Sequence, residues 1–459
     1  MLDKNIAADV LHEAISLGAD FADVFVERKN VQNLSFNSSK VKDIQSGTDF
    51  GIGVRLIYGK QYLYGYTNSA KKEDLIELTR NLAAQIKNSS NGAFKSNFAT
   101  TEYPLIGSFG DKSASLDQKV AKLKELDTLV RAQGEHIAQV NISLIQYNQQ
   151  VEIFDSEGLY ASESRPYCRM AANAVAKDGQ AQTSGSWNPG ARGGYSFVEG
   201  LDMKWIAEYL GKKTHTILYA DPCPAGNKPV VIDNGFGGVI FHEACGHLLE
   251  TTSVQKKASV FWDKKEQMIA HEALSAVDDG TIDNLWGSLS IDDEGMSTQK
   301  TQLIKDGKLE NFLSDRMGEL KSGHKRTGSA RRQSYKFAPA SRMRNTFIEP
   351  GPHKLEELIA SMDDGIYAKS MGGGSVNPGT GEFNFAVEEG YLVKNGKIQK
   401  PVKGATLIGK GEDIMKRMSM VGDTLDYAAG MCGSVSGSIP VTVGQPPVKV
   451  DEILVGGNA

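Results

Sequence analysis

A proline- and glycine-rich segment, DPCPAGNKP at residues 221–229, divides the 459-residue chain and constrains its fold more than any other feature. Proline and glycine interrupt helices and strands, so this cluster is typical of a connection between folding units. At about 150 residues per domain, a chain of this length has room for two or three domains with cores of their own. We therefore predict two domains, formed by residues 1–220 and 221–459.

The part before this segment mixes helical and strand patterns. Apolar residues recur at helical spacing near the start and within residues 75–86 and 120–130, and a further helix is expected at about 201–215. Short β-branched and aromatic runs between residues 24 and 64 are separated by Asn, Gly and Ser, as in an antiparallel sheet. The Ser-, Asn-, Gly- and Thr-rich stretch at residues 88–116 is predicted to be a loop or wrapping arm. These patterns predict an amino-terminal antiparallel sheet with helices.

Beyond residue 229 the chain is richer in glycine and in strand patterns, for example GGGSVNPGTGEFNF from Gly372 and SGSIPVTVGQP from Ser436. These features predict a β-rich carboxy-terminal domain, so the expected fold class is α+β with two domains. The glycine run at residues 372–374 permits close backbone approach, which makes Gly373 a candidate contact for an extended substrate.

Charge and composition narrow the classes of partner. Lys and Arg total 51 against 56 Asp and Glu, a net charge of -5, which provides no broad attraction for nucleic acid or an anionic membrane. No apolar run approaches the roughly 20 residues that span a bilayer, and no secretory signal pattern follows Met1, so we predict a cytoplasmic protein. The four cysteines include no C-x-x-C pair, so a disulfide framework is not expected.

One segment, VVIDNGFGGVIFHEACGHLLE, carries candidate chemistry. It predicts a buried strand at residues 230–232 and then a helix bearing His242, Glu243 and His247. Two imidazoles can hold Zn²⁺ while a neighbouring glutamate takes a proton from water, as in H-E-x-x-H metallopeptidases. Here the spacing is H-E-x-x-x-H, which places the imidazoles about 140° apart on an ideal helix. A π-bulge or a break near Gly246 would bring them together, and on these residues alone core or capping histidines are an equal alternative.

The second half of the chain contains six sequence motifs in a fixed order: FHEACGHLLE, GSLSIDDEGMSTQKTQLIKDGKLENFLSDR, RRQSYKFAPASRMRNTFIEPG, GIYAKSMGGGSVNPGTGEFNF, KPVKGATLIGKG and MCGSVSGSIPVTVGQPPVKV. With them, the chain resembles the TldD branch of the TldD/PmbA (TldE) family. The resemblance is dense from about residue 220 to the end. It is looser but collinear before that, through GADFADVFVE and GIGVRLIYGKQYLYGYTN.

This resemblance implies a zinc metalloprotease that processes or degrades unfolded peptides. By matching text, it assigns the zinc ligands to His242, His247 and Cys432 and the catalytic role to Glu243. It also implies a heterodimer with a TldE-like subunit, and a homodimer is the alternative. We expect Cys432 to approach the metal from a turn between Gly430 and Gly433.

The expected reaction is hydrolysis of extended peptides by a zinc-activated water, with Glu243 as the proton acceptor. The alternative is a non-catalytic peptide-binding subunit with a structural zinc. Structural zinc sites usually have four protein ligands, whereas the resemblance supplies three and leaves a position for water.

Three further groups of residues are candidates. Cys245 lies inside the motif but is expected to be a small buried thiol. The acidic run at residues 292–294 could support a ligating histidine, bind a substrate amine or form a solvated turn. Within the basic stretch at residues 325–344, Arg332 could meet a peptide carboxylate and Tyr335 could donate to an oxyanion, and a solvated basic face or a structural ion-pair network is the alternative.

Overall fold

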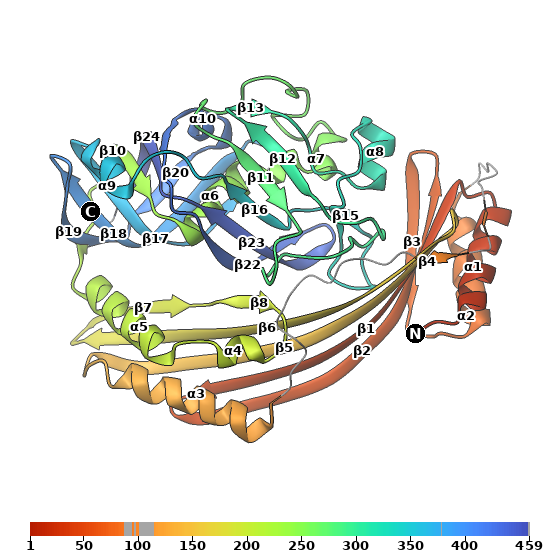
Figure 1. Cartoon of the computed structure of the whole chain (residues 1–459), viewed down its shortest axis with the longest axis horizontal. Helices are drawn as coiled ribbons and strands as arrows, with labels where there is room; N and C mark the ends of the chain where they lie inside the picture. The colour runs from red at the N-terminus through yellow and green to blue at the C-terminus, as the bar shows by residue number, and fades with distance from the viewer. Residues whose placement is uncertain (87–93, 96–97, 101–113, 378, 458–459) are drawn as a thin grey trace.

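The computed structural model describes residues 1–86, 94–95, 98–100, 114–377 and 379–457. Helices and strands occur on both sides of the predicted boundary, which confirms the α+β fold class (Figure 1). The loop predicted at residues 88–116 lies largely outside the described residues. Within the described part, no helix is both long and apolar enough to cross a membrane.

The first sheet has eight strands, and its longest members pair antiparallel, as predicted. Its strand order is β3-β2-β1-β5-β6-β4, and β7 and β8 also pair with β6. Inward-facing residues alternate along β5, for example Val140, Ile142 and Leu144. The strands are β1 (Phe21–Asn37), β2 (Lys40–Tyr58), β3 (Gln61–Thr67), β4 (Ala99–Thr100), β5 (Ile137–Asp155), β6 (Leu159–Asp178), β7 (Ala181–Trp187) and β8 (Gly190–Arg192).

Helices cover this sheet at two places. Near β1 to β3 lie α1 (Lys4–Ser16) and α2 (Lys72–Ala83), while α3 (Leu116–Arg131) and α5 (Met203–Leu218) pack against β5 and β6 (Figure 1). A single turn, α4 (Ser196–Glu199), precedes α5. Ser115 and Gln118 form a capping box at the start of α3, and Gly18 has a φ of 89° just after α1, as its position after the helical pattern predicts.

The second sheet is built after residue 220 and closes on itself. Its order is β17-β10-β24-β20-β18-β19-β9, and an additional pairing of β17 with β18 joins the ends of the central path into a ring. The strands are β9 (Asp221–Pro222), β10 (Gly226–Ile232), β17 (Asp364–Val376), β18 (Glu382–Lys394), β19 (Lys397–Lys403), β20 (Thr406–Lys410), β21 (Met418–Val421) and β24 (Val448–Gly456).

The third sheet has the order β13-β12-β11-β16-β23-β22. Its members are β11 (Ala276–Asp279), β12 (Lys300–Lys305), β13 (Lys308–Leu309), β16 (Asn345–Ile348), β22 (Asp426–Ser434) and β23 (Gly437–Gln445). A separate pair joins β14 (Ala330–Arg331) to β15 (Ala340–Ser341). The β-rich character expected beyond residue 229 is therefore present in both sheets.

Short helices connect these strands and share one large apolar core with the second and third sheets. They are α6 (Val239–Ala244), α7 (Thr251–Val254), α8 (Arg316–Ser322), α9 (Leu355–Ala360) and α10 (Gly411–Lys416), with 3₁₀ turns η1 (Gly235–Gly238) and η2 (Gly246–Leu249). Ile240 and Phe241 of α6 are fully buried in that core, so this helix is held firmly in place.

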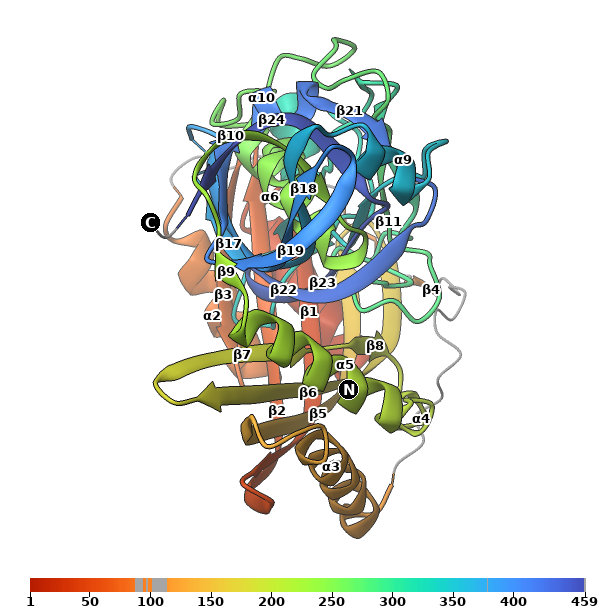
Figure 2. The ribbon, with the colours of Figure 1, turned by 90° about the vertical axis from the view of Figure 1, so that its left-hand side faces the viewer.

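The long strands of the first sheet curve beneath the carboxy-terminal half, and the second view shows this half stacked on them (Figures 1 and 2). Buried ion pairs cross the junction, including Arg55 to Glu294 and Arg165 to Asp293. Tyr335 packs with Phe25 of β1 in a cluster shared by both parts. The two-domain division at residue 220 stays a prediction.

Candidate metal centre

The segment bearing the two histidines is a helix that breaks after one and a half turns. The α-helix ends at Ala244, Cys245 leaves the helical region with φ -133° and ψ -50°, and the 3₁₀ turn η2 begins at Gly246. A break between His242 and Leu248 was expected from the spacing, and it is confirmed. The dihedral change falls on Cys245, whereas Gly246 is needed for close packing, because a Cβ there would lie 2.2 Å from Sδ of Met343.

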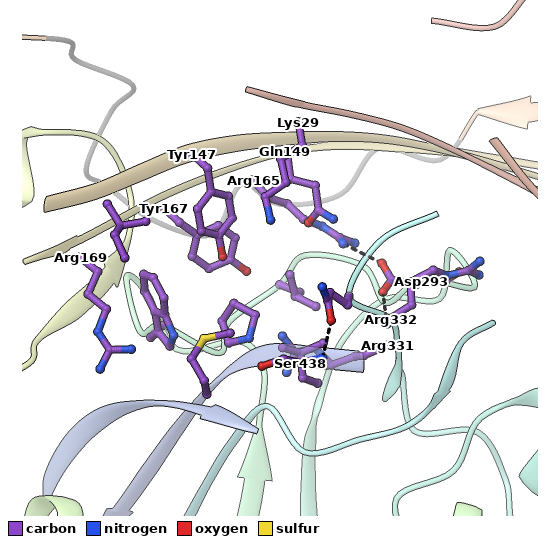
Figure 3. Close-up of a pocket in the computed structure, with 17 residues that line it drawn as sticks. Lys29, Tyr147, Gln149, Arg165, Tyr167, Arg169, Asp293, Arg331, Arg332 and Ser438 are labelled. Carbon is purple, nitrogen blue, oxygen red and sulfur yellow. Dashed lines mark hydrogen bonds and ion pairs between the residues drawn. The ribbon is translucent and has the colours of Figure 1, made fainter. Parts of the chain in front are cut away.

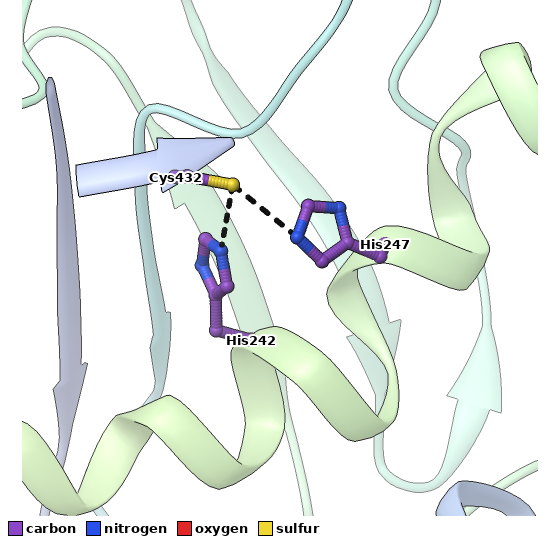
Figure 4. A group of neighbouring side chains, drawn as sticks. All are labelled: His242, His247 and Cys432. Atoms are coloured by element: carbon purple, nitrogen blue, oxygen red, sulfur yellow. Dashed lines mark hydrogen bonds between the residues drawn. The ribbon is translucent and has the colours of Figure 1, made fainter. Parts of the chain in front are cut away.

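The break turns both imidazoles toward Cys432, as Figure 4 shows. Nε2 of His242 lies 3.3 Å from the Cys432 sulfur, and Nε2 of His247 lies 3.2 Å from the same atom. The expectation that Cys432 lies in a turn was wrong: it is in β22, paired with Ile439 of β23. Strand pairing fixes the direction of its side chain more firmly than a turn would, so the sulfur is presented from the edge of the third sheet.

These three residues suit a metal ion by their donor chemistry and spacing. One donor atom from each lies within 4.8 Å of the others. The measured N–S distances are close to the separation of about 3.5 Å expected for adjacent ligands of a tetrahedral zinc with bonds of about 2.0 to 2.3 Å. Burial raises the pKa of the Cys432 thiol, but His242 and His247 lower it more, to about 4, so the ligating thiolate is favoured.

His247 is oriented by a buried carboxylate. Its Nδ1 lies 3.0 Å from Oε2 of Glu250, which leaves Nε2 directed at Cys432. Such a carboxylate–histidine pair fixes the ring orientation and increases the basicity of a ligand. The other oxygen of Glu250 accepts a hydrogen bond from the Met343 amide at 3.1 Å. Glu250 follows His247 by three residues, and that spacing was the one sequence signal for its role.

Arg342 supports the strand hairpin that carries Cys432. Its side chain is fully buried and donates to the Cys432 carbonyl at 2.7 Å and to Ser436 and Gly437 at 3.0 Å each. Its Nε also lies 3.8 Å from Glu250. Arg342 therefore links the cysteine strand to the carboxylate that orients His247. The sequence placed it only within a basic stretch and indicated no such role.

Glu243 lies beside the metal group without belonging to it. Its Oε2 is 3.7 Å from Nε2 of His247, and its side chain is 21% exposed. In contrast, the ring of His242 is almost completely buried, and its Nδ1 has no hydrogen-bond partner among the described residues. The carboxylate of Glu243 is thus the acid–base group next to the converging donors that solvent can reach.

Cys245 and Cys168 are buried away from this group, as a structural role for each requires. The Cys245 side chain is fully buried in the core, and burial raises the pKa of its thiol well above the usual value. Cys168 lies in a different cluster against α3 and α5, and burial raises the pKa of its thiol to about 12. Neither thiol is poised to ligate a metal or to react.

The acidic run at residues 292–294 is buried, so the solvated turn, one of the alternatives that the sequence left open, was wrong. Asp293 pairs with Arg165, and Glu294 pairs with Arg55, both from the first sheet. Asp292 accepts from backbone amides, including those of Glu294, Met296 and Ala330. Among the described residues, none of the three forms a hydrogen bond or ion pair with a histidine. Asp293 and Glu294 join the two halves, and Asp292 holds the backbone of its own half.

Two of the three substrate-binding candidates, Arg332 and Tyr335, both pack against Phe25, and all three candidates stay predictions. The Tyr335 hydroxyl donates to Asp49 at 3.1 Å and accepts from Asn68 at 2.7 Å, so it is engaged with the first half. Arg332 stacks on Phe25 with its guanidinium 4.2 Å from the ring centre. Gly373 is exposed in β17, with no atom within 4 Å of the place its Cβ would occupy.

Three family models match the chain in order. The model described as PmbA/TldA metallopeptidase domain 1 matches residues 22–86, the central domain matches residues 110–218, and the C-terminal domain matches residues 225–457. The metal group and the acidic run both fall in the third match.

Curated relatives extend over nearly the whole chain. A protein named Metalloprotease TldD homolog from Haemophilus influenzae is 36% identical over 453 residues, covering 96% of this chain and 93% of its own. One from Saccharolobus solfataricus, named Zinc metalloprotease TldD homolog, is 27% identical and covers 97% of this chain and 99% of its own.

Solved structures show the same fold. The crystal structure of TldE from Thermococcus kodakarensis has a TM-score of 0.77 at 18% identity, covering 98% of this chain and 100% of that one. A Thermotoga maritima structure has a TM-score of 0.81 at 20% identity, covering 98% and 99%, and both neighbours share this fold.

Proposed function

The chain belongs to the TldD branch of the PmbA/TldD family and is a metallopeptidase, and from that premise we propose that it hydrolyses extended, unfolded peptides with zinc as cofactor. The observation that carries the proposal is the convergence of His242, His247 and Cys432 beside Glu243. Two imidazoles and a thiolate are preferred zinc donors, and a solvent-accessible carboxylate beside them is what general-base catalysis requires.

Bound at these residues, zinc would supply Lewis-acid chemistry, polarising the scissile carbonyl and making water a stronger acid. Glu243 would accept the proton from the attacking water at its carboxylate and then return it to the leaving amine. Glu250 would hold the His247 ring with Nε2 facing Cys432, and Arg342 would keep the Cys432 strand in place through its carbonyl. In this proposal His242, His247 and Cys432 are the ligands, Glu243 transfers the proton, and Glu250 and Arg342 hold the ligands in position.

The competing function, a peptide-binding subunit with a structural zinc, is less well supported. A structural zinc normally has four protein ligands, and the described residues bring three donors together. In addition, Glu243 is partly exposed beside them and is not a member of the group. A solvent-accessible carboxylate can take a proton from water during catalysis, whereas a closed structural zinc site does not require one.

An extended substrate is supported by the exposed part of β17. Beyond Ala368 this strand pairs with β18 alone among the described residues, because its pairing with β10 ends there. An open strand edge can hydrogen-bond an extended peptide by strand addition, which selects unfolded chains.

The fold shared with TldE leads us to propose pairing with a TldE-like subunit, with a homodimer as the alternative. Light scattering of the chain alone and mixed with such a subunit distinguishes the two assemblies.

The test is peptide hydrolysis together with metal analysis for wild type and Glu243→Gln. The amide keeps the size of the side chain but cannot accept the proton, so we expect hydrolysis to fall by roughly 10² or more while zinc content stays near one per chain. Glu272→Gln makes the same change on an exposed residue and should behave as wild type. Both proteins are assayed alone and mixed with a TldE-like subunit. Full activity in Glu243→Gln, or a zinc-loaded wild type that hydrolyses no unfolded peptide in either case, would contradict the proposal.

A further inference from the structure

A cavity of about 290 Å³ lies at the junction of the two halves (Figure 3). We call it the junction pocket. Its walls come from β1, β5 and β6 of the first sheet and from the segments around residues 286–293, 331–333 and 438–440 of the second half. Its charged and aromatic lining residues are Lys29, Tyr147, Arg165, Tyr167, Arg169, Trp286, Asp293, Arg331 and Arg332.

The charges of this pocket are strongly unbalanced. Five of its lining residues are basic and one, Asp293, is acidic. Asp293 is already paired with Arg165, which also pairs with Glu163. The remaining four basic residues form no ion pair with any carboxylate that the structure describes; they are Lys29, Arg169, Arg331 and Arg332.

Arg331 shows this imbalance most clearly. Its side chain is about 3% exposed, and its one hydrogen bond among the described residues goes to the Met343 carbonyl at 2.7 Å. Burial lowers the pKa of Arg331 and that of Lys29, which means that desolvation disfavours both charges. A buried cation without a counter-ion is costly, and an anion entering the pocket would relieve that cost.

Two tyrosines add uncharged donors. The rings of Tyr147 and Tyr167 stack with centres 4.7 Å apart, and neither hydroxyl has a hydrogen bond within the described part of the chain. Burial raises the pKa of both hydroxyls, so both remain protonated and can donate. Trp286 packs edge-on against Tyr167, which gives the pocket an aromatic wall beside its cations.

The pocket lies close to the candidate metal centre along the chain and the sheet. Met431 and Ile439 line the pocket. Met431 directly precedes Cys432 in β22, and Ile439 of β23 pairs with Cys432. Arg331 donates to the carbonyl of Met343, whose amide donates to Glu250. The pocket therefore borders the strand that presents Cys432 to the metal centre.

We propose that the junction pocket is a substrate subsite that binds a carboxylate of the peptide, an inference that rests on the proposed peptidase function. Arginine forks and tyrosine hydroxyls are well suited to carboxylate oxygens. The aromatic and apolar walls accommodate the rest of one residue, which a site for a bare inorganic anion would not need. The carboxylate is either the carboxy terminus of the peptide or an acidic side chain.

The test measures binding and does not depend on hydrolysis. The zinc-loaded Glu243→Gln protein is titrated into four hexapeptides that carry the same uncharged fluorophore at the amino terminus. They are hexa-alanine with a free carboxylate, its carboxy-terminal amide, and two such amides in which one Ala is replaced by Glu or by Gln. We expect the free acid, the Glu-containing amide, or both, to bind roughly 10-fold or more tightly than the neutral peptides. Preference for the free acid identifies the terminus, and preference for Glu over Gln identifies a side chain.

Equal affinity for all four peptides, or no binding of any, would overturn the subsite. If the preference is present but zinc-loaded wild type hydrolyses no peptide, the proposed function fails while an anion subsite stands. If wild type hydrolyses all four peptides alike and binding shows no preference, the proposed function stands and the subsite fails.

Variants then locate the preference within the pocket. Lys29 and Arg169 are partly exposed and form no ion pair among the described residues, so Lys29→Met and Arg169→Gln should fold normally. Each should reduce the preference for the carboxylate several-fold. Lys60→Met removes the same charge from the exposed turn between β2 and β3 and should leave the preference unchanged. An unchanged preference in both pocket variants would place the carboxylate elsewhere.

Discussion

Buried polar groups are arranged differently at the candidate metal centre and at the junction between the two halves. At the junction, the guanidinium of Arg55 pairs with the carboxylates of both Asp23 and Glu294, so these three buried charges are compensated within the chain. At the metal centre, two imidazoles and a thiol meet one another, and one ring nitrogen of His242 has no partner among the described residues. This ion-pair cluster is complete within the chain, whereas the metal centre has donors to spare for a cation.

This difference separates what holds the fold from what performs chemistry. Removing one partner of a buried ion pair leaves an uncompensated charge and lowers the free energy of unfolding. Removing one donor at the metal centre takes a ligand away from the cation, so the loss should appear in metal affinity. Substitutions at the junction should therefore lower the free energy of unfolding, whereas substitutions at the metal centre should lower zinc affinity and peptidase activity.

The largest effect is expected for Cys432→Ala. Without the thiolate two protein donors remain, so we expect zinc affinity and peptide hydrolysis to fall together by roughly 10³ or more. Zinc content after dialysis and hydrolysis of an unfolded peptide are the measurements. Cys168→Ala and Cys245→Ala remove thiols that are also buried and serve as matched controls, which should keep both zinc and activity. Cys432→Ala with full zinc content would exclude this cysteine as a ligand.

The second effect belongs to the junction. Arg55→Met leaves the buried carboxylates of Asp23 and Glu294 without their cation, and we expect a loss of about 3 to 5 kcal/mol in the free energy of unfolding. Urea unfolding of the zinc-loaded protein measures it. Arg80→Met breaks an exposed ion pair with Glu13 and should cost at most about 1 kcal/mol. If the two variants are equally stable, the junction pairs do not hold the halves together.

A smaller effect at the metal centre is expected for Glu250→Gln. The amide retains an acceptor for the Met343 amide but loses the negative charge beside His247. We expect zinc affinity to fall by about 10- to 100-fold, the usual effect of removing an outer carboxylate. A competition titration with a chelator gives the affinity. Glu250→Asp retains the charge, and a better affinity than in Glu250→Gln would show that charge, and not packing alone, matters.

The repeating patterns of the chain predicted its regular elements well, because helix and strand periods are local. The helices at residues 72–83 and 116–131 and the antiparallel hairpins of the first sheet are where the patterns put them. The break after His242 was also predictable, since a regular helix could not bring both rings to one side.

Long-range packing decided what the patterns could not predict. The role of residues 292–294 stayed open because their partners, Arg55 and Arg165, lie more than 120 positions away in the chain. The place of Cys432 in a strand depends on pairing with β23, and glycines on both sides of it suggested a turn instead. The need for glycine at residue 246 comes from Met343, which no local pattern brings near.

The smallest effect concerns Asp315, a buried carboxyl at the start of α8 near the junction. It accepts a hydrogen bond from the Gly318 amide at 2.8 Å, and burial together with the nearby charge of Glu294 raises its pKa from 3.8 to about 7. A carboxyl whose pKa is higher in the folded state favours folding when protonated. Its contribution is fully present below pH 4 and is lost as the pH rises through about 7.

We therefore expect wild type to lose stability relative to Asp315→Asn as the pH rises from about 4 to about 8, because asparagine retains the helix cap without acquiring a charge. Thermal unfolding of both proteins across this range should show a difference in Tm that changes by a few degrees, of the order of 1 kcal/mol or more. Asp202→Asn makes the same change at the exposed cap of α5, where burial is absent, and its difference from wild type should stay nearly constant. A constant difference for Asp315→Asn as well would mean that this carboxyl is as easily ionised in the folded protein as in the unfolded chain, and that the junction tolerates its charge.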